Sequence, residues 1–273
     1  MNLISLSLDD REIRVAPGTS LLEAARRSGI SIPTLCHDPR LPAAASCRLC
    51  LVEVEGKRQN VPACATPAEE GLGVHTATPA LQAYRRLTIE MLLADHPMDC
   101  LTCAKTGDCK LQDYALEFGA DPDRFAKRQA HPDCTLDLSQ PLLALDWAKC
   151  VKCGLCVRAC DQLQGQQVLG WTGRGHRARV GYLGDSLQDS GCVFCGTCAS
   201  VCPTGAITDR LLHTTKTRAW ERRPVVTTCT YCGTGCELTV HKKGNEIIQI
   251  TSDKDAEPNH CLLFLKCRYG FTF

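Results

Sequence analysis

The pattern of apolar and polar residues predicts a β-hairpin and a short helix at the start of the chain. Residues 3–8 alternate between apolar and polar, residues 9–10 (Asp-Asp) mark a turn, and residues 11–15 return as a second strand. The sequence Ser-Leu-Leu-Glu at 20–23 is typical of a capping box, so we expect a helix that starts there and ends at Gly29.

The same reasoning predicts further elements along the chain. Residues 51–55 alternate as a strand, and residues 80–95 have helical spacing. Leu81, Tyr84, Leu87 and Met91 are expected near one face of this helix. Residues 211–224 are expected to form a polar linker, followed by a strand at 225–228 and a hairpin over 237–250 around Gly-Asn.

Length and charge limit the functions that the chain can have. Its 273 residues suggest about two domains. With 31 Lys+Arg against 30 Asp+Glu the formal charge is +1, so nucleic-acid or membrane-surface binding has no electrostatic support. No apolar window approaches the roughly 18 residues of a membrane span, and the N-terminus lacks a secretory signal. We therefore expect a cytoplasmic protein.

The composition is unusual in its 21 cysteines. Their odd number and the lack of an export signal make a disulfide scaffold the weaker explanation. Many of them lie in tight C-x2-C runs, which favours thiolate metal sites, either zinc or iron–sulfur. Two runs of C-x2-C-x2-C-x3-C are the bacterial ferredoxin pattern, so we expect iron–sulfur clusters. A zinc-binding interaction scaffold is the alternative of another class.

The N-terminal region contains the pattern of a [2Fe–2S] site. Its cysteines are spaced C-x10-C-x2-C-x13-C, on a hairpin-plus-helix frame comparable to that of plant-type ferredoxins. The longer first gap resembles the variant in large respiratory and hydrogenase-type electron-transfer subunits. The expected ligands are Cys36, Cys47, Cys50 and Cys64.

The next motif has three cysteines and one nearby histidine. Cys100, Cys103 and Cys109 leave a [4Fe–4S] cubane one ligand short, and His96 can supply the missing nitrogen. An imidazole in place of a thiolate removes negative charge and should raise the reduction potential. The motif H-P-x2-C-x2-C-x5-C resembles the one-histidine site of complex I, NAD-linked hydrogenases and soluble formate dehydrogenases.

The paired ferredoxin runs predict two further cubanes. In this pattern three cysteines of a run bind one cluster and the fourth binds the other. One set of expected ligands is Cys150, Cys153, Cys156 and Cys202, and the other is Cys192, Cys195, Cys198 and Cys160. The basic residues between the runs, Arg174, His176, Arg177 and Arg179, are expected in a solvated loop rather than at a partner subunit.

The last motif, formed by Cys229, Cys232 and Cys236, has the spacing C-x2-C-x3-C. It resembles the opening of molybdenum or tungsten bis-pterin oxidoreductases, especially formate dehydrogenases. In that family a fourth cysteine follows, just ahead of an electron-conducting lysine to which Lys266 corresponds by position. Phe264 stands where the family has this cysteine. Cys261, Cys267, a three-cysteine site and a sequence error all stay open as explanations.

The resemblance as a whole is to the α subunit of a soluble, NAD-linked, molybdenum-dependent formate dehydrogenase. It implies one [2Fe–2S] cluster, up to four [4Fe–4S] clusters and, only in a longer protein, a Mo/W-bis-pterin guanine dinucleotide. The partner would be a flavin/NAD-binding diaphorase-type subunit or ferredoxin. No catalytic residue is expected within these residues, since the family's catalytic body follows position 273. The electron-transfer subunit of an NAD-linked or [FeFe] hydrogenase is the alternative.

These motifs imply an α+β chain of successive iron–sulfur domains. We expect a β-grasp [2Fe–2S] domain at 1–79, a histidine-ligated helical segment at 80–148 and a 2[4Fe–4S] ferredoxin domain at 149–210. The linker at 211–224 precedes the start of a molybdopterin oxidoreductase [4Fe–4S] domain at 225–273. Cys134 has no cysteine neighbour at ligand spacing and is expected to be a free thiol.

Overall fold

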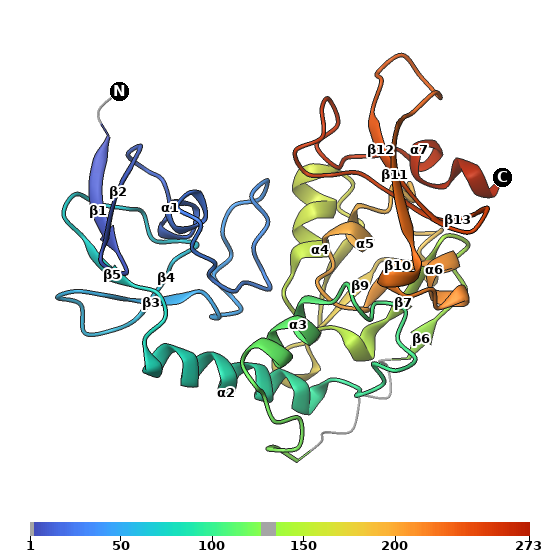
Figure 1. Ribbon diagram of the computed structural model, residues 1–273. Helices are drawn as coiled ribbons and strands as arrows, with labels where there is room; N and C mark the ends of the chain where they lie inside the picture. The colour runs from blue at the N-terminus through green and yellow to red at the C-terminus, as the bar shows by residue number, and fades with distance from the viewer. Residues whose placement is uncertain (1–2, 127–134) are drawn as a thin grey trace. The chain divides into compact units, whose positions relative to one another are not determined.

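The computed structural model describes residues 3–126 and 135–273, which form mixed α/β structure (Figure 1). The chain divides into two compact units, Met1–Ala94 with Asp113–Lys127 and Asp95–Gln112 with Arg128–Phe273. The expected α+β class is confirmed, whereas the finer division into four domains stays a prediction. The predicted free thiol Cys134 lies outside the described residues.

The first unit is built on a five-stranded sheet of order β2-β1-β5-β3-β4. Its strands are β1 (Ile4–Leu8), β2 (Arg11–Val15), β3 (Leu51–Val54), β4 (Val61–Pro62) and β5 (Gly73–His75). β1 pairs with β5 in parallel and the other neighbours are antiparallel. The expected β1–β2 hairpin is confirmed, and its turn places Asp9 at φ 46° and Asp10 at φ 65°.

The helix that packs on this sheet begins where the capping pattern predicted. The hydroxyl of Ser20 accepts a hydrogen bond from the Glu23 N–H at 3.2 Å, which satisfies one of the free donors at the start of α1 (Leu21–Arg27). Buried side chains of α1 and the sheet, such as Leu21, Leu8 and Val52, form one apolar core.

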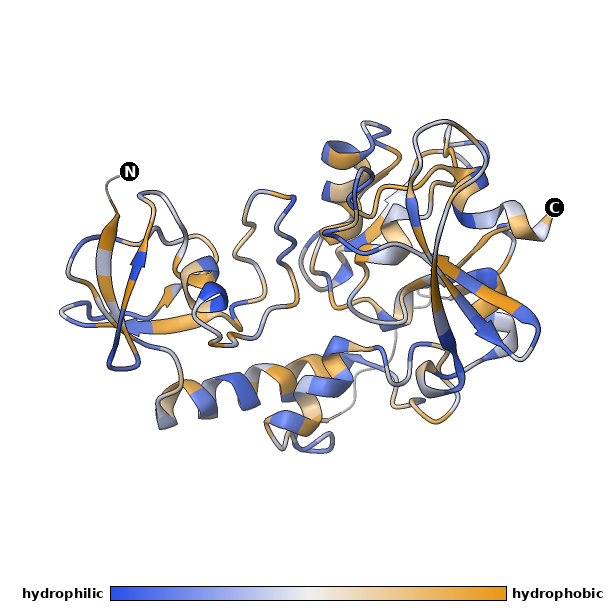
Figure 2. Cartoon of the chain, turned by 45° about the horizontal axis from the view of Figure 1, so that its top comes forward, coloured by the Kyte–Doolittle hydropathy of each residue, from blue (hydrophilic) through white to orange (hydrophobic). Residues whose placement is uncertain are grey.

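The long helix α2 (Pro79–Asp95) has the expected extent, and of the four apolar residues expected near one face only Leu81 is buried. Met91 is 55% exposed, whereas Arg85 and Ile89 are buried with Leu81. Arg85 interrupts the apolar spacing on its side of the helix. It can nevertheless be buried because its guanidinium donates to backbone carbonyls instead of to water. Figure 2 shows polar and apolar residues alternating along this helix.

Glu90, also buried on α2, is held by an electrostatic cluster that the sequence did not predict. Its carboxylate lies 2.9 Å from Arg86 Nε and 3.1 Å from Arg124 Nη1, and it accepts a 3.1 Å hydrogen bond from the Asp121 N–H. Burial acts to raise the pKa of Glu90, but these partners together lower it below its usual value. Asp121 and Arg124 follow α3 (Lys110–Glu117), so these contacts hold the segment after α3 against α2.

The second unit contains two small sheets, with orders β10-β7-β6 and β8-β9. Its strands are β6 (Leu136–Asp137), β7 (Leu143–Asp146), β8 (Leu169–Thr172), β9 (Arg179–Tyr182) and β10 (Ile207–Asp209), and its helices include α4 (Leu155–Arg158), α5 (Thr197–Val201) and α6 (Arg210–Thr215). Arg174 and Arg177 are exposed between β8 and β9, so the expected solvated loop is the end of a hairpin.

The C-terminal part of this unit is a three-stranded sheet of order β11-β12-β13 followed by a helix. These elements are β11 (Arg223–Thr228), β12 (Glu237–Lys243), β13 (Glu246–Thr251) and α7 (Leu265–Tyr269). The expected hairpin over 237–250 is confirmed. The expected linker at 211–224 is not simply a linker, because α6 covers its first part. Pro224 lies within β11, an edge strand that tolerates the missing N–H donor.

The described residues include no helix that is long and apolar enough to cross a membrane.

Candidate metal centres

The four cysteines expected to bind a [2Fe–2S] cluster lie close together in the first unit. The Sγ atoms of Cys50 and Cys64 are 3.4 Å apart. The Cys47 N–H donates to Cys36 Sγ at 3.4 Å, and the Leu35 N–H donates to Cys47 Sγ at 3.5 Å. Backbone N–H groups directed at thiol sulfurs suit a cluster, because they stabilise negative charge on the ligands.

The protonation of these thiols is strongly coupled. The hydrogen bond between the Cys36 and Cys47 side chains lowers the pKa of the Cys36 thiol to about 4 and raises the pKa of the Cys47 thiol. In the second pair, the contact with Cys64 raises the pKa of Cys50. Metal binding at these cysteines would displace the protons that their thiols still hold.

Arg85 is a residue of this site that the sequence did not reveal. It is 2% exposed, and its guanidinium donates to the carbonyl oxygens of Leu49 and Leu51, each at 3.1 Å. These two residues flank Cys50, so a buried positive charge holds the ligand loop. A lone arginine in a helical pattern carries no signal that could have predicted this contact.

The second unit contains two cavities that match the paired ferredoxin runs. Cys150, Cys153, Cys156 and Cys202 line one of them. The other is lined by Cys160, Cys192, Cys195 and Cys198. Each cavity therefore receives three cysteines of one run and the fourth cysteine of the other run, which is the crossed arrangement expected from the spacing.

The two runs fold by the same local rule. Each places its second spacer residue at positive φ, Lys152 at 55° and Phe194 at 49°, and the N–H of that residue donates to the first sulfur of the run at 3.4 Å. Gly154 (φ 72°) and Gly196 (φ 73°) then open α4 and α5. Glycine adopts the left-handed conformation at little cost. The glycine that follows the second cysteine of each run therefore favours the turn that directs the thiols inward.

The runs differ after the helix begins. α4 continues into a π-helical turn over Ala159–Leu163, which contains Cys160. Such turns are rare and often occur at functional sites, because they displace one side chain from the regular α-helical position. No signal in the sequence predicted this turn.

The innermost thiols of both cavities are buried among the others. Burial raises the pKa of Cys156 well above its usual value, and the neighbouring sulfurs of Cys202, Cys153 and Cys150 raise it further. Burial has the same effect on Cys198, whose sulfur neighbours include Cys195, Cys192 and Cys160. Each cavity thus gathers several thiols that resist ionisation. Such a group of thiols fits a cationic group that would bind them as thiolates.

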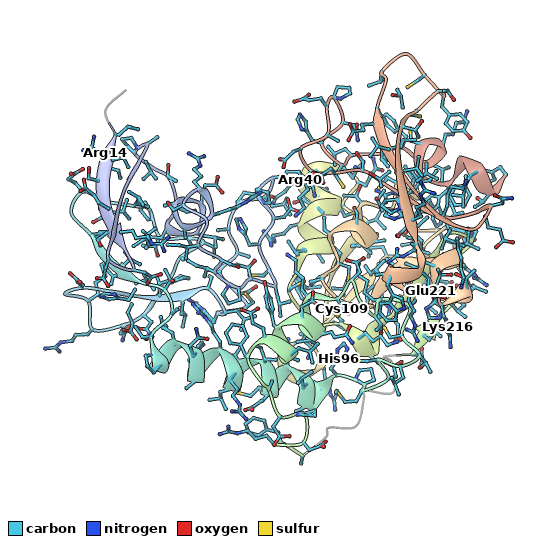
Figure 3. The ribbon with its side chains drawn as sticks, in the orientation of Figure 1. Arg14, Arg40, His96, Cys109, Lys216 and Glu221 are labelled. Atoms are coloured by element: carbon cyan, nitrogen blue, oxygen red, sulfur yellow. The ribbon has the colours of Figure 1, made fainter. Side chains whose placement is uncertain are left out.

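The segment of the histidine motif forms a chain of tight turns in the second unit. Cys103 N–H donates to the Cys100 carbonyl at 3.3 Å, and the Arg218 guanidinium donates to the carbonyls of Cys100 and Cys103. Burial raises the pKa of Cys109 to about 11. His96 is half-buried just beyond α2, and Figure 3 labels it together with Cys109. Its role as a ligand stays a prediction.

This segment adjoins the ferredoxin runs. A Cβ at Gly205 would lie 3.0 Å from Cys103 Sγ and 3.3 Å from Lys149 Cδ, so the missing side chain permits close approach. Lys149 is buried and pairs with Asp99 at 2.9 Å and Asp146 at 3.1 Å. Burial acts to lower the pKa of Lys149, but these carboxylates outweigh it and raise the value.

A further cysteine, which the sequence left undecided, lies beside the last motif. Cys267 is 3% exposed and is buried in the same cluster as Cys229 and Cys236. Burial, followed by the contact with Cys229, raises the pKa of Cys267 to about 11. These three cysteines share one apolar cluster with Leu263.

The other residues of this motif are arranged differently. Phe264 is 72% exposed, and Cys261 lies in the electrostatic surroundings of Arg268. Cys232 is exposed, with Sγ 3.3 Å from Thr234 Oγ1. Lys266 is exposed on α7. Of the two spare cysteines, Cys267 belongs to the buried cluster of Cys229 and Cys236, and Cys261 does not.

Within residues 3–126 and 135–273, no three His, Cys, Asp or Glu side chains are grouped closely enough to hold a single metal ion. The ferredoxin-run thiols line two cavities, four thiols to each.

Four family models match successive parts of the chain. They are a 2Fe-2S iron-sulfur cluster binding domain (2–79), the NADH-ubiquinone oxidoreductase-G iron-sulfur binding region (85–124), a 4Fe-4S dicluster domain (149–206) and the molybdopterin oxidoreductase Fe4S4 domain (223–272). The match supports one 2Fe-2S site and several 4Fe-4S sites.

Relatives match over nearly the whole chain. A NADH-quinone oxidoreductase component from Rhizobium meliloti is 39% identical over 99% of this chain and 31% of its own length. NADPH-Fe(3+) oxidoreductase subunit alpha of Geobacter sulfurreducens is 31% identical over the same shares. A chain in the crystal structure of NAD+-reducing [NiFe]-hydrogenase in the H2-reduced state is 36% identical, with a TM-score of 0.69, over 76% of this chain and 87% of that chain.

The chain belongs to the same family as the matched chain of NAD+-reducing [NiFe]-hydrogenase, and over nearly its whole length it is similar to an NADH-quinone oxidoreductase component. It spans about a third of the length of the curated relatives it matches. Because similarity to a quinone oxidoreductase component extends over 99% of this chain, the motif array of this family does not by itself point to formate. The expected iron–sulfur domains are confirmed, and the relatives that match the chain are oxidoreductase components.

Proposed function

We propose that this iron–sulfur subunit is an electron relay that holds one [2Fe–2S] and four [4Fe–4S] clusters within a larger NAD(P)-linked oxidoreductase. The observation that supports this most is the pair of cavities, each lined by four cysteines drawn from both ferredoxin runs. Random enrichment in cysteine does not produce two complete tetrads in crossed register. When bound, such clusters supply one-electron transfer.

The chain's own residues would set the conditions for that transfer. Thiolates supply the ligands, backbone N–H groups donate to Cys36, Cys150 and Cys192, and the apolar walls around the sulfurs exclude water. These are the levers by which a protein tunes reduction potentials. The close approach of Gly205 to Cys103 supports continuity between the histidine motif and the ferredoxin runs.

The electron donor is the finer part of the proposal. Formate, oxidised at a Mo/W-pterin centre outside these residues, is favoured by the Cys229 motif and its match to the molybdopterin oxidoreductase Fe4S4 domain. A hydrogenase partner is the second candidate, since a chain of an NAD+-reducing [NiFe]-hydrogenase is 36% identical. Molybdenum or tungsten with formate-dependent NAD reduction in the native complex would support the first, and co-purification with a nickel hydrogenase the second.

Elemental analysis of the anaerobically purified chain tests the relay. About 18 irons and matching acid-labile sulfide are expected with five sites filled, and about 14 irons with the last site empty. Zinc near the site count with little iron would overturn the relay in favour of a structural scaffold.

His96→Cys tests the histidine motif. The variant should keep its cubane and show a lower potential by EPR-monitored titration, because a thiolate adds negative charge. His213→Ala, in α6 and outside the motifs, is the matched control. Unchanged spectra and potentials in His96→Cys would show that His96 is not a ligand.

For the last site we propose Cys229, Cys232, Cys236 and Cys267 as the ligands, with Lys266 as the residue that mediates electrons toward a pterin. Cys267→Ser should lower the iron content by up to about four atoms per chain. Cys261→Ser, also buried, is the control and should leave it unchanged. The reverse result would assign the site to Cys261 instead.

A further inference from the structure

Arg268 is the largest side chain that the described residues bury completely, with 1% of its surface exposed. It follows Cys267 on α7 and reaches the ferredoxin run, where its Nε donates to the Cys195 carbonyl at 3.0 Å. Its Nη1 donates to the Ile250 carbonyl at 3.4 Å. One guanidinium thus joins the last cysteine motif to a ligand residue of the neighbouring cavity.

Among the described residues, no carboxylate lies within ion-pair distance of the Arg268 guanidinium. Its Nη2 is buried without a hydrogen-bond partner in the described part of the chain. The carboxylate in its electrostatic surroundings, Asp209, accepts hydrogen bonds from Tyr269 Oη and Gln249 Nε2, each at 2.6 Å. Buried charges in folded proteins are normally paired or bound to metals, so these contacts leave the guanidinium in need of an anion.

The backbone next to Cys195 is adapted to this side chain. A Cβ at Gly196 would lie 2.4 Å from Arg268 Cδ and 2.6 Å from Tyr269 Oη. Glycine at 196 therefore serves two purposes, the left-handed turn that opens α5 and the space into which Arg268 and Tyr269 pack. The close approach to Gly196 therefore fixes where the charged Arg268 side chain lies.

We propose that Arg268 is the buried counter-charge of the cluster held by Cys160, Cys192, Cys195 and Cys198, and that it raises the reduction potential of this cluster relative to one without a neighbouring cation. The proposal rests on the relay proposed above. A thiolate-bound cubane has a net negative charge, which is the anion that the unpaired guanidinium needs. Through its charge, Arg268 would make the cluster in this cavity, next to the Cys229 motif, easier to reduce.

The test is an EPR-monitored redox titration of the iron-loaded chain in wild type, Arg268→Met and Arg268→Lys. In Arg268→Met the oxidised-to-reduced ratio of one ferredoxin-type cluster at a fixed potential should rise about tenfold, which is a shift of about 59 mV for one electron. Arg268→Lys keeps the charge and should stay near wild type. The [2Fe–2S] signal in the same sample is the internal control.

Asp209→Asn gives the opposite perturbation and guards against a variant that fails to fold. Removal of this buried negative charge should raise the potential of the same cluster, a sign that loss of packing alone would not produce. Unchanged potentials in both Arg268→Met and Asp209→Asn, with all clusters present, would overturn the proposal. A wild-type chain without iron and sulfide would instead overturn the relay itself.

Discussion

Substitution of Gly196 by alanine should destabilise the second unit because two separate restraints act at this position. The residue has φ 73° and opens α5, and its Cα faces the Arg268 and Tyr269 side chains. An L-residue in left-handed conformation costs about 1–2 kcal/mol. The methyl group would also lie 2.4 Å from Arg268 Cδ, and overpacking of this kind costs about 1–3 kcal/mol. The sum is about 2–5 kcal/mol of unfolding free energy.

Gly191→Ala is the matched control for this prediction. Gly191 lies immediately before Cys192 and has φ 78°, but its Cβ would meet nothing within 4 Å. The control should therefore lose only the conformational contribution of about 1–2 kcal/mol. The assay is anaerobic urea unfolding of the iron-loaded chain, followed by loss of visible absorbance, with midpoints compared at equal slope. Equal midpoints for the two variants would refute the packing of Arg268 against position 196.

Three further substitutions test other contacts. Ser20→Ala removes the cap of α1 and should cost about 1 kcal/mol in urea unfolding of the first unit; no change would mean that the cap is dispensable. Glu90→Gln should lower the melting temperature at neutral pH. Because the folded pKa of Glu90 is lowered, its stabilisation is present above the unfolded value of about 4.3 and lost as pH falls through the folded pKa, so wild type and variant should converge in acid. Lys149→Met leaves Asp99 and Asp146 without their cation and should cost up to about 3 kcal/mol; a neutral effect would show that the pair is solvent-screened.

The local elements near the N-terminus were predictable because short-range chemistry decides them. The turn at Asp9 and the Ser20 cap need only neighbouring residues, and both occur where expected. The residues that α2 buries were not predictable from apolar spacing, because Arg85 is polar in sequence but buried in the fold. Its guanidinium finds carbonyl acceptors more than thirty residues away, which no periodicity records.

The cysteine runs by themselves determined which thiols could share a site, since the two- and three-residue spacings allow few backbone paths and the glycines at 154 and 196 select one of them. Only the tertiary structure shows which of the two spare cysteines is buried beside the last motif. Cys261 and Cys267 are the same residue type and follow Cys236 at similar distances along the chain, but the docking of α7 turns Cys267 toward Cys229. The same docking buries Arg268 against Cys195, because a side chain's partner is set by where its helix packs and not by its position in the sequence.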